Sequence, residues 1–452
     1  MERPSTPSGF NQIVLLTASI RRNLGVHPCT VLLLGLCFFL PALLLGTSSL
    51  KAPALNRRGT AELFAITRRA RLVQSFEADP STPVPKLWKQ RLGASAALDR
   101  WARHGRRHWW LIWLDDGVPL LALPPAANRS SLDLLFADDL HRSSYDQQTP
   151  LEKRTPSALE QACLQRLIRG TAVQWQPAGL AAISGPLFPA LASASHGCLS
   201  LVLQGKYLMA EGPVGPSPFA SFQDAKPRGY SNRPGFDPTQ AYLELNSIAL
   251  QPLLGSFLNN PLIAEQLASR YGVPEPLRDV LLTAPVLLRV DALETGRFQA
   301  SVQARLMVPA EHTANVEKSL DAVATALLRR GFQQEQRPLQ MQDRASSNRI
   351  AEVWLDSNGQ PSGGWSLGAK KHGHSELLLA LGAPPTPGSH RFRRMGDQRL
   401  RLRGRPDDLV QLGWLGPGWP RVIRNAVQLE LEMTALPMQQ QPGWLSLQLE
   451  LR

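Results

Sequence analysis

Four arginines near the C-terminus have the most suggestive spacing of any residues in this chain that could do chemistry. They occupy alternate positions: Arg399, Arg401, Arg403 and Arg405. In an extended strand, alternate side chains point to one face, which leaves Leu400 and Leu402 on the other. The pattern predicts a cationic stripe backed by core, suited to anionic lipid or an acidic protein surface. The alternative is a solvated strand whose charges protect a sheet edge.

A phosphate backbone is a further candidate for the same stripe. Proteins that hold single-stranded nucleic acid combine basic residues with aromatic side chains on which the bases stack. No aromatic residue interleaves with the four arginines. Nucleic-acid binding is therefore the weakest of the three interpretations, and it requires the large domain to face the cytoplasm.

Two of the four cysteines, Cys163 and Cys198, lie outside the apolar N-terminal stretch. They form a disulfide if this part of the chain faces an oxidising compartment, and the alternative is two buried free thiols. No C-x-x-C pair occurs, which argues against a structural zinc ribbon.

Other polar groupings give no catalytic, cofactor-binding or metal-ligating prediction. The acidic pairs 115–116, 138–139 and 407–408 stand in turn-like contexts, where Asp hydrogen-bonds its own backbone. His372 and His374 would share a face of a strand, but no third ligand is evident. Phosphate-loop, dinucleotide-binding, zinc-protease and serine-hydrolase motifs are missing.

The strongest positional signal is a stretch without Asp, Glu, Lys or Arg between Arg22 and Lys51. About 20 apolar residues span a bilayer, so residues 29–50 predict a transmembrane helix that contacts lipid. A cleaved signal peptide and a buried core helix are the alternatives. The sequence after the apolar core is a poor cleavage site, because Leu50 and Pro53 flank the best position.

Basic residues stand on both sides of this helix, so their distribution does not define its orientation. An N-terminal signal anchor usually exports the part of the chain on its C-terminal side. We therefore expect the large domain on the periplasmic or lumenal side.

The remaining chain predicts an α+β fold rich in antiparallel sheet. We expect a short tail over 1–28, a membrane-proximal helix and linker over 51–82, and two α+β modules over 83–228 and 229–452. Helices are predicted over 59–77, 86–104, 155–170, 253–271 and 311–331. The segment 212–236 has little apolar periodicity and separates the modules.

Two hairpin signals suggest an internal duplication. Trp113-Leu114-Asp115-Asp116-Gly117 precedes an apolar strand ending at 122–125, and a similar run, 354–359, comes before a strand ending at 380–385. Asp-Gly favours a tight turn. Coincidence between two hairpins is the alternative. Trp109, Trp110 and Trp113 predict mainly core packing, with interfacial anchoring as the alternative.

Composition bounds the class of protein. The 452 residues are 43% hydrophobic and 19% charged, with a net charge of +13, which is typical of a folded globular region and not of a disordered tail. The positive balance indicates an acidic environment or partner.

The layout resembles uncharacterised single-pass membrane-anchored proteins of cyanobacteria. The resemblance rests on the N-terminal anchor, the hairpin at 110–124, and the segments 241–254 and 400–420. It implies no activity. We expect a membrane-tethered, non-catalytic binding or assembly factor, with a membrane-bound hydrolase or transferase as the alternative.

Overall fold

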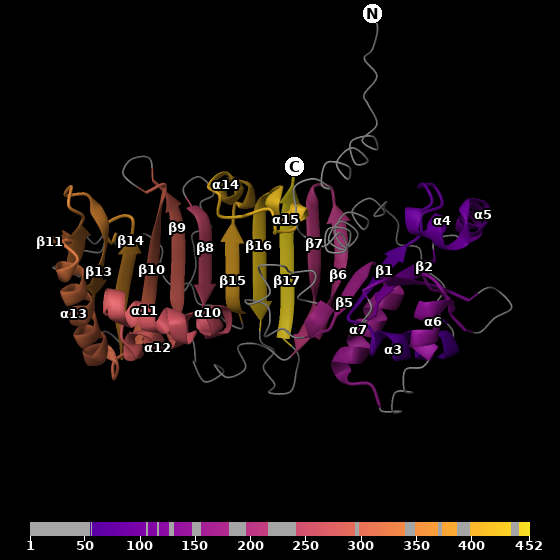
Figure 1. The fold of residues 1–452 in the computed structure, drawn as a ribbon, viewed down its shortest axis with the longest axis horizontal. Helices are drawn as coiled ribbons and strands as arrows, with labels where there is room; N and C mark the ends of the chain where they lie inside the picture. Colours follow the sequence, from indigo (N-terminus) through magenta and orange to yellow (C-terminus); the bar gives the residue numbers. More distant parts are fainter. Residues whose placement is uncertain are drawn as a thin grey trace, which may run out of the picture.

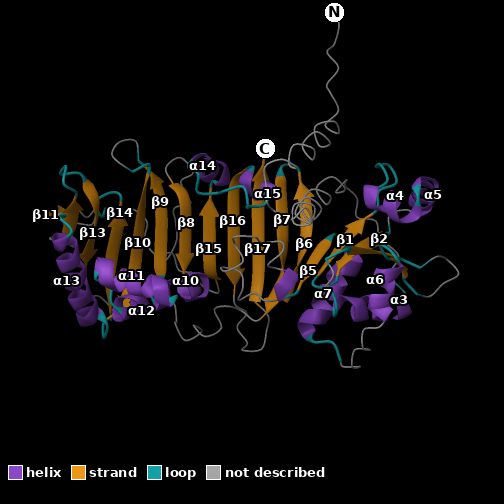
Figure 2. Ribbon diagram, viewed as in Figure 1, coloured by secondary structure: helices purple, strands orange, loops and turns teal. Residues whose placement is uncertain are grey.

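A computed structural model describes Leu55 and the ranges 57–104, 107–114, 117–125, 131–146, 155–179, 196–215, 241–293, 298–339, 349–368, 373–386, 398–434 and 443–452. Within them the fold is one long antiparallel sheet with helices packed on it (Figures 1 and 2). The prediction of mixed helix and strand with a large antiparallel sheet is confirmed.

The sheet has 17 strands. Their order across the sheet is β4-β3-β2-β1-β5-β6-β7-β17-β16-β15-β8-β9-β10-β14-β13-β12-β11, and every pair is antiparallel. The strands are β1 (Leu72–Glu77), β2 (His108–Trp113), β3 (Pro119–Leu123), β4 (Asp133–Leu135), β5 (Ala172–Trp175), β6 (His196–Gln204), β7 (Tyr207–Gly215), β8 (Ala241–Ser247), β9 (Val286–Ala292), β10 (Ala300–Pro309), β11 (Gln333–Leu339), β12 (Arg349–Leu355), β13 (Pro361–Leu367), β14 (His374–Leu381), β15 (Gln398–Gly404), β16 (Ala426–Thr434) and β17 (Gly443–Leu451).

The helices fall into three groups along the sheet (Figure 1). They are α3 (Arg57–Thr67), α4 (Lys86–Leu92), α5 (Ala94–His104), α6 (Asp139–Asp146) and α7 (Ala158–Arg169) near the N-terminal strands; α14 (Pro406–Gln411) and α15 (Arg421–Arg424) near the centre; and α10 (Gln251–Leu258), α11 (Pro261–Tyr271), α12 (Glu275–Thr283) and α13 (Thr313–Arg329) at the far end.

The N-terminal strands are covered on both faces. On one face, Trp88 of α4 and Trp101 of α5 pack with Trp109 of β2. On the other, Leu63 of α3 and Leu167 of α7 belong to a second apolar cluster. Because both faces are buried, β2 is buried at every position, as expected for a strand with core on either side.

The C-terminal strands bury an apolar face against helices α10 to α13. Leu306 and Leu377 of the sheet pack with Leu277, Val316 and their neighbours on those helices. Near the centre, Val422 and Ile423 of α15 pack on the same face. The alternating pattern of β10, β16 and β17 follows from this arrangement, since only one set of side chains meets core.

The first predicted hairpin forms, whereas the second forms with a different partner strand from the predicted one. β2 pairs β3 and β12 pairs β13, and their turns carry Gly117 at φ 73° and Gly359 at φ 74°. The later apolar strands differ: residues 122–123 end the second strand of the first hairpin, whereas 380–381 end β14, one strand later. Asp115 and Asp116 lie outside the described residues.

Two helix predictions were wrong in part. The predicted helix 59–77 ends at Thr67, and Leu72–Glu77 forms β1, since pairing with β2 and β5 there outweighs the helical pattern. The predicted helix 86–104 is two helices that break at Gly93, whose φ of 80° a helix cannot accommodate. The sequence also missed α12 and the strands β11 and β13.

The predicted transmembrane segment 29–50 and the expected module boundary at 228/229 lie outside the described residues. No helix within the described ranges is long and apolar enough to cross a bilayer. Strand pairing runs without interruption from the first expected module into the second, through β7 and β17.

Candidate interaction surface

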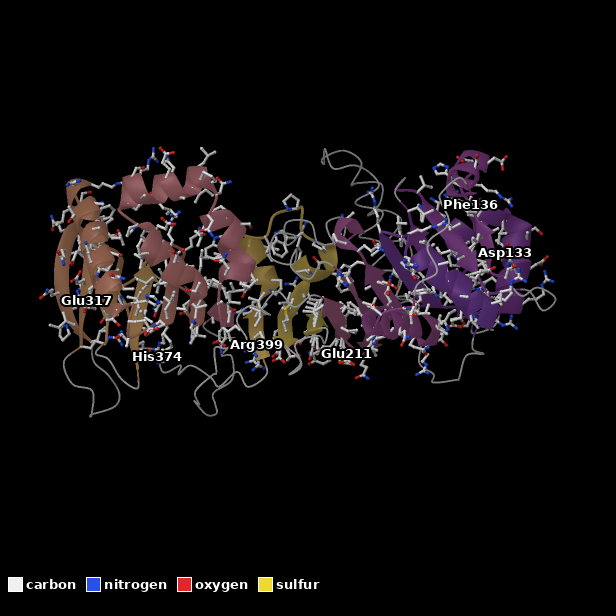
Figure 3. All side chains as sticks on the ribbon, turned by 90° about the horizontal axis from the view of Figure 1, so that it is seen from below. Asp133, Phe136, Glu211, Glu317, His374 and Arg399 are labelled. Atoms are coloured by element: carbon white, nitrogen blue, oxygen red, sulfur yellow. A yellow bond between two sulfur atoms is a disulfide. The ribbon has the colours of Figure 1, made fainter. Side chains whose placement is uncertain are left out.

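One face of the sheet, here called the polar face, carries ionisable and amide side chains over many neighbouring strands. Strand registers place these side chains on it: Glu211 (β7), Gln448 (β17), Glu430 and Glu432 (β16), Arg399, Arg401 and Arg403 (β15), Glu244 and Asn246 (β8), Arg289 and Asp291 (β9), Gln303 and Arg305 (β10), and Glu376 (β14). In Figure 3, Glu211 and Arg399 lie on the side of the sheet away from α10 to α12.

The centre of the polar face is an arginine–glutamate cluster. Arg401 stands opposite Glu432 and Arg403 opposite Glu430. Arg401 Nε is 2.9 Å from an oxygen of each glutamate, and Arg403 lies 3.1 Å from Glu430. The side chains of Arg401 and Arg403 are only 15% and 14% exposed, so these charges are shielded and largely compensated.

A second cluster lies where β10, β12 and β14 meet. Glu376 accepts from Arg349 at 2.6 Å and from Arg305 at 3.1 Å. Arg349 also donates to Ser366 Oγ at 2.9 Å and to the Ser366 carbonyl oxygen at 2.8 Å. Burial lowers the pKa of Arg305 and neighbouring Arg349 adds to the effect, whereas Glu376 opposes it. Two guanidinium groups thus share one carboxylate.

Between the two clusters is a shallow depression of about 40 Å³. Arg289, Gln303 and Arg305 line it from the sheet, and Pro385 and Thr386 close one side. Arg289 pairs with Asp291, and Thr386 donates to Gln303 at 2.8 Å. A space of this size holds one or two water molecules, so it suits a side chain tip better than a whole small molecule.

The structure separates the four arginines predicted to form a stripe. Arg399, Arg401 and Arg403 share the polar face, with Leu400 buried behind them, as predicted. Arg405 follows the end of β15 and pairs with Asp408. β15 lies between β8 and β16, so the alternative of charges that protect a sheet edge was wrong. Binding of an anionic partner stays a prediction.

Arg399 differs from its neighbours. Its Nε and Nη1 atoms are buried, and neither has a hydrogen-bond partner within the described ranges. Buried donors of this kind usually find a partner, so Arg399 is a candidate contact point on the polar face.

Cys163 and Cys198 form a disulfide with their Cα atoms 5.4 Å apart. Cys163 lies on α7 and Cys198 on β6, and both are buried. The bridge therefore fixes α7 to the sheet at the point where double coverage ends.

The remaining polar predictions resolve as local structure. Asp138 accepts from the His141 backbone at 2.9 Å, and Asp407 accepts from the Asp408 backbone at 3.0 Å and also pairs with the distant Arg452. His374 begins β14, whereas His372 lies outside the described residues. Within the described ranges no group of three His, Cys, Asp or Glu side chains is placed to hold a metal ion.

All three tryptophans of β2 are buried: Trp109, Trp110 and Trp113. The prediction that most of them serve core packing is confirmed. Trp109 stacks on Phe76 with ring centroids 4.4 Å apart, and Trp110 donates to the Leu167 carbonyl at 2.9 Å.

Sequence reasoning missed the acidic partners of the arginines. Glu430 and Glu432 have the same two-residue spacing as Arg401 and Arg403, so alternation along 427–434 was the available signal. Nothing in the sequence states that these two strands are neighbours in that register.

Comparison with known proteins adds no relative. No protein-family model matches the chain, no curated protein matches it, and no solved structure matches it.

Proposed function

We propose that this protein is a membrane-tethered, non-catalytic binding or assembly factor whose polar face docks a protein partner. The observation that carries the proposal is the row of arginines and carboxylates across β16, β15, β8, β9, β10 and β14. A broad face of alternating charge selects a partner by complementary charge pattern. The depression beside Arg289 and Arg305 holds only about 40 Å³, which fits this use better than turnover of a small substrate.

The charge balance of the polar face favours a protein over an anionic polymer. Glutamates compensate Arg401 and Arg403, Asp291 pairs with Arg289, and Glu376 offsets one of the two charges of Arg305 and Arg349. A nucleic acid would need uncompensated basic residues to displace its counterions.

The proposed location is the periplasmic or lumenal side of a membrane, held by residues 29–50. The disulfide between Cys163 and Cys198 supports it, because disulfides persist in oxidising compartments. A membrane-impermeant thiol reagent, applied to intact cells, tests the location. We expect the reagent to label Cys163 and Cys198 while the cells are still unbroken. The labelling should appear only after the disulfide is reduced and a denaturant has exposed the two buried sulfurs. Free thiols reached only in broken cells would contradict it.

Site-specific photo-crosslinking in living cells tests the docking surface. A photoreactive residue at the exposed Glu211 of the polar face should give a discrete protein adduct. The same residue at Glu317, which is exposed on α13 on the helical side, is the matched control. The adduct should weaken when Arg289→Glu alters the polar face.

Equal adducts at positions 211 and 317, or none at 211, would overturn the docking proposal. A metal ion or small ligand that copurifies at the depression lined by Arg289 and Arg305 would instead favour the hydrolase or transferase.

A further inference from the structure

The helix pair α10–α11 exposes an apolar corner. Leu254 and Phe257 on α10 are 38% and 57% exposed, and Leu262 in the first turn of α11 is 74% exposed. Positions three apart lie on the same side of a helix, and only Asn259 and Asn260 separate the two helices. The three exposed side chains stand on either side of this short turn, which is here called the α10–α11 corner.

The α10–α11 corner also lacks charge. No Asp, Glu, Lys or Arg occurs from Gln251 to Ala264, and Glu265 ends the uncharged stretch. α11 has no buried residue. A surface helix normally turns charged and polar side chains to solvent. The uncharged corner therefore indicates a surface that contacts an apolar partner or phase.

The corner is held firmly, and its exposure is not the fraying of a loose end. Leu250, Leu253 and Leu258 pack in the cluster beneath α10. Arg278 Nη1 donates to the Leu258 carbonyl at 3.3 Å. Asn260 caps α11 by accepting from Leu262 N at 3.0 Å. The exposed side chains thus stand on a rigid support.

Basic and aromatic side chains lie at the other end of α11. Arg270 is in its last turn, and the Arg330 guanidinium lies 4.8 Å from the ring centre of Tyr271. Tyrosine and arginine suit the headgroup level of a membrane, and basic residues there attract anionic lipid. An apolar tip and a basic, aromatic rim at opposite ends of one surface helix suit an interfacial contact.

The position of the corner agrees with such a contact. In Figure 1, α3 and the helices α10 to α12 lie toward the same long edge of the sheet, and α4 and α5 lie toward the opposite edge. α3 begins at Arg57, seven residues after the predicted membrane helix. Seven extended residues reach at most about 25 Å, which would keep the α3 edge near the bilayer.

We propose that the α10–α11 corner inserts Leu254, Phe257 and Leu262 into the interface of a bilayer that contains anionic lipid. It is a second membrane contact, which orients the sheet relative to the membrane. The inference goes beyond the proposed function and shares with it only the membrane tether.

Fluorescence of the full chain in vesicles tests this contact. Cys29 and Cys37 are changed to Ser, and the Cys163–Cys198 disulfide is kept. Phe257→Cys is labelled with an environment-sensitive dye, and Leu98→Cys is the control, since Leu98 is a 54% exposed apolar residue of α5. Vesicles contain phosphatidylcholine with or without phosphatidylglycerol, and a lipid-borne quencher.

The dye at position 257 should shift to the blue and lose emission to the quencher, more so with phosphatidylglycerol, while the dye at 98 should do neither. Adding Leu254→Ser and Leu262→Ser should remove the response at 257 without changing the circular dichroism. An unquenched dye at 257 would overturn the proposal. So would a blue shift in detergent that depends on protein concentration, which would assign the corner to a second copy.

Resistance to alkaline extraction from the same vesicles reports separately on residues 29–50. If the protein is extracted at alkaline pH but the dye at 257 is still quenched, the membrane tether at 29–50 is contradicted and the contact through the α10–α11 corner is supported. If the protein resists extraction but the dye at 257 is not quenched, only the contact through the α10–α11 corner is contradicted.

Discussion

The N-terminal part and the centre of the sheet share antiparallel strand pairing but differ in how their faces are covered. β2, in the doubly covered region, reads HWWLIW and is buried throughout. β16, in the singly covered region, reads AVQLELEMT and buries fewer than half of its residues. Apolar packing on both faces dominates in the first region, whereas the second adds clustered ion pairs on the polar face. The comparison indicates that stability is concentrated near β1 and β2, and the proposed recognition would use the polar face near β15 and β16.

Removing a large core side chain from the doubly covered region should have the largest effect. Trp109→Ala should reduce the free energy of unfolding by about 4 to 5 kcal/mol, because it leaves a cavity between Phe76 and Trp88. Urea unfolding of the full chain in mild detergent, followed by circular dichroism, measures this. Trp414→Ala, at a 48% exposed position, should change it by less than about 0.5 kcal/mol. Similar losses in both variants would contradict the comparison.

Acid should weaken the doubly covered region selectively. Burial lowers the pKa of His104 and of His108 to about 4 each, and Arg107 and Arg100 add to the effect at His104. Since both folded-state values lie below the unfolded value near 6.5, stability is complete above about pH 6.5 and falls as the pH drops toward 4. At pH 5 the loss should be about 2 kcal/mol per histidine.

Hydrogen exchange at pH 7 and pH 5 measures this loss by region. Protection should fall first in α4, α5 and β2, and a variant with His104→Gln and His108→Gln should show less pH dependence there. A uniform loss of protection over the whole sheet would show that His104 and His108 do not cause the pH dependence of stability.

Reducing the disulfide should lower the free energy of unfolding by an intermediate amount. Cys163 and Cys198 close a loop with a sequence separation of 35, for which the chain-entropy model gives about 3 to 4 kcal/mol. Denaturation with and without dithiothreitol measures the loss. Cys163→Ser with Cys198→Ser should give the same value and no further response to dithiothreitol. An unchanged unfolding midpoint would show that α7 stays packed on β6 without the disulfide, and that the disulfide adds no stability.

Breaking the central ion-pair cluster should have the smallest effect on stability. Glu430→Gln removes the carboxylate that Arg401 and Arg403 share, and should cost about 1 to 3 kcal/mol by leaving charges partly unpaired. Glu317→Gln on the exposed face of α13 is the control and should be nearly neutral. A loss larger than that of Trp109→Ala would reverse the comparison between the two regions.

Much of the secondary structure followed from local signals. The helical patterns of 155–170 and 311–331 and the tight turn ending at Gly117 predicted elements that the structure contains. The prediction failed at 72–77, where β1 pairs on both sides, and at 333–339, whose polar residues carry no strand pattern. Local pattern reports what a segment buries, but not which neighbour covers it.

The candidate surface shows the same division. The sequence by itself determined that Arg399, Arg401 and Arg403 share a face, because the strand repeat of two residues requires it. It also predicted mainly core packing for tryptophans 109, 110 and 113, and all three are buried because core covers both faces of β2. Only the tertiary structure decided that Glu430 and Glu432 neutralise the arginines, and that Cys163 meets Cys198. Those contacts depend on which distant strands and helices become neighbours, and in what register, which is set by burial across the whole sheet.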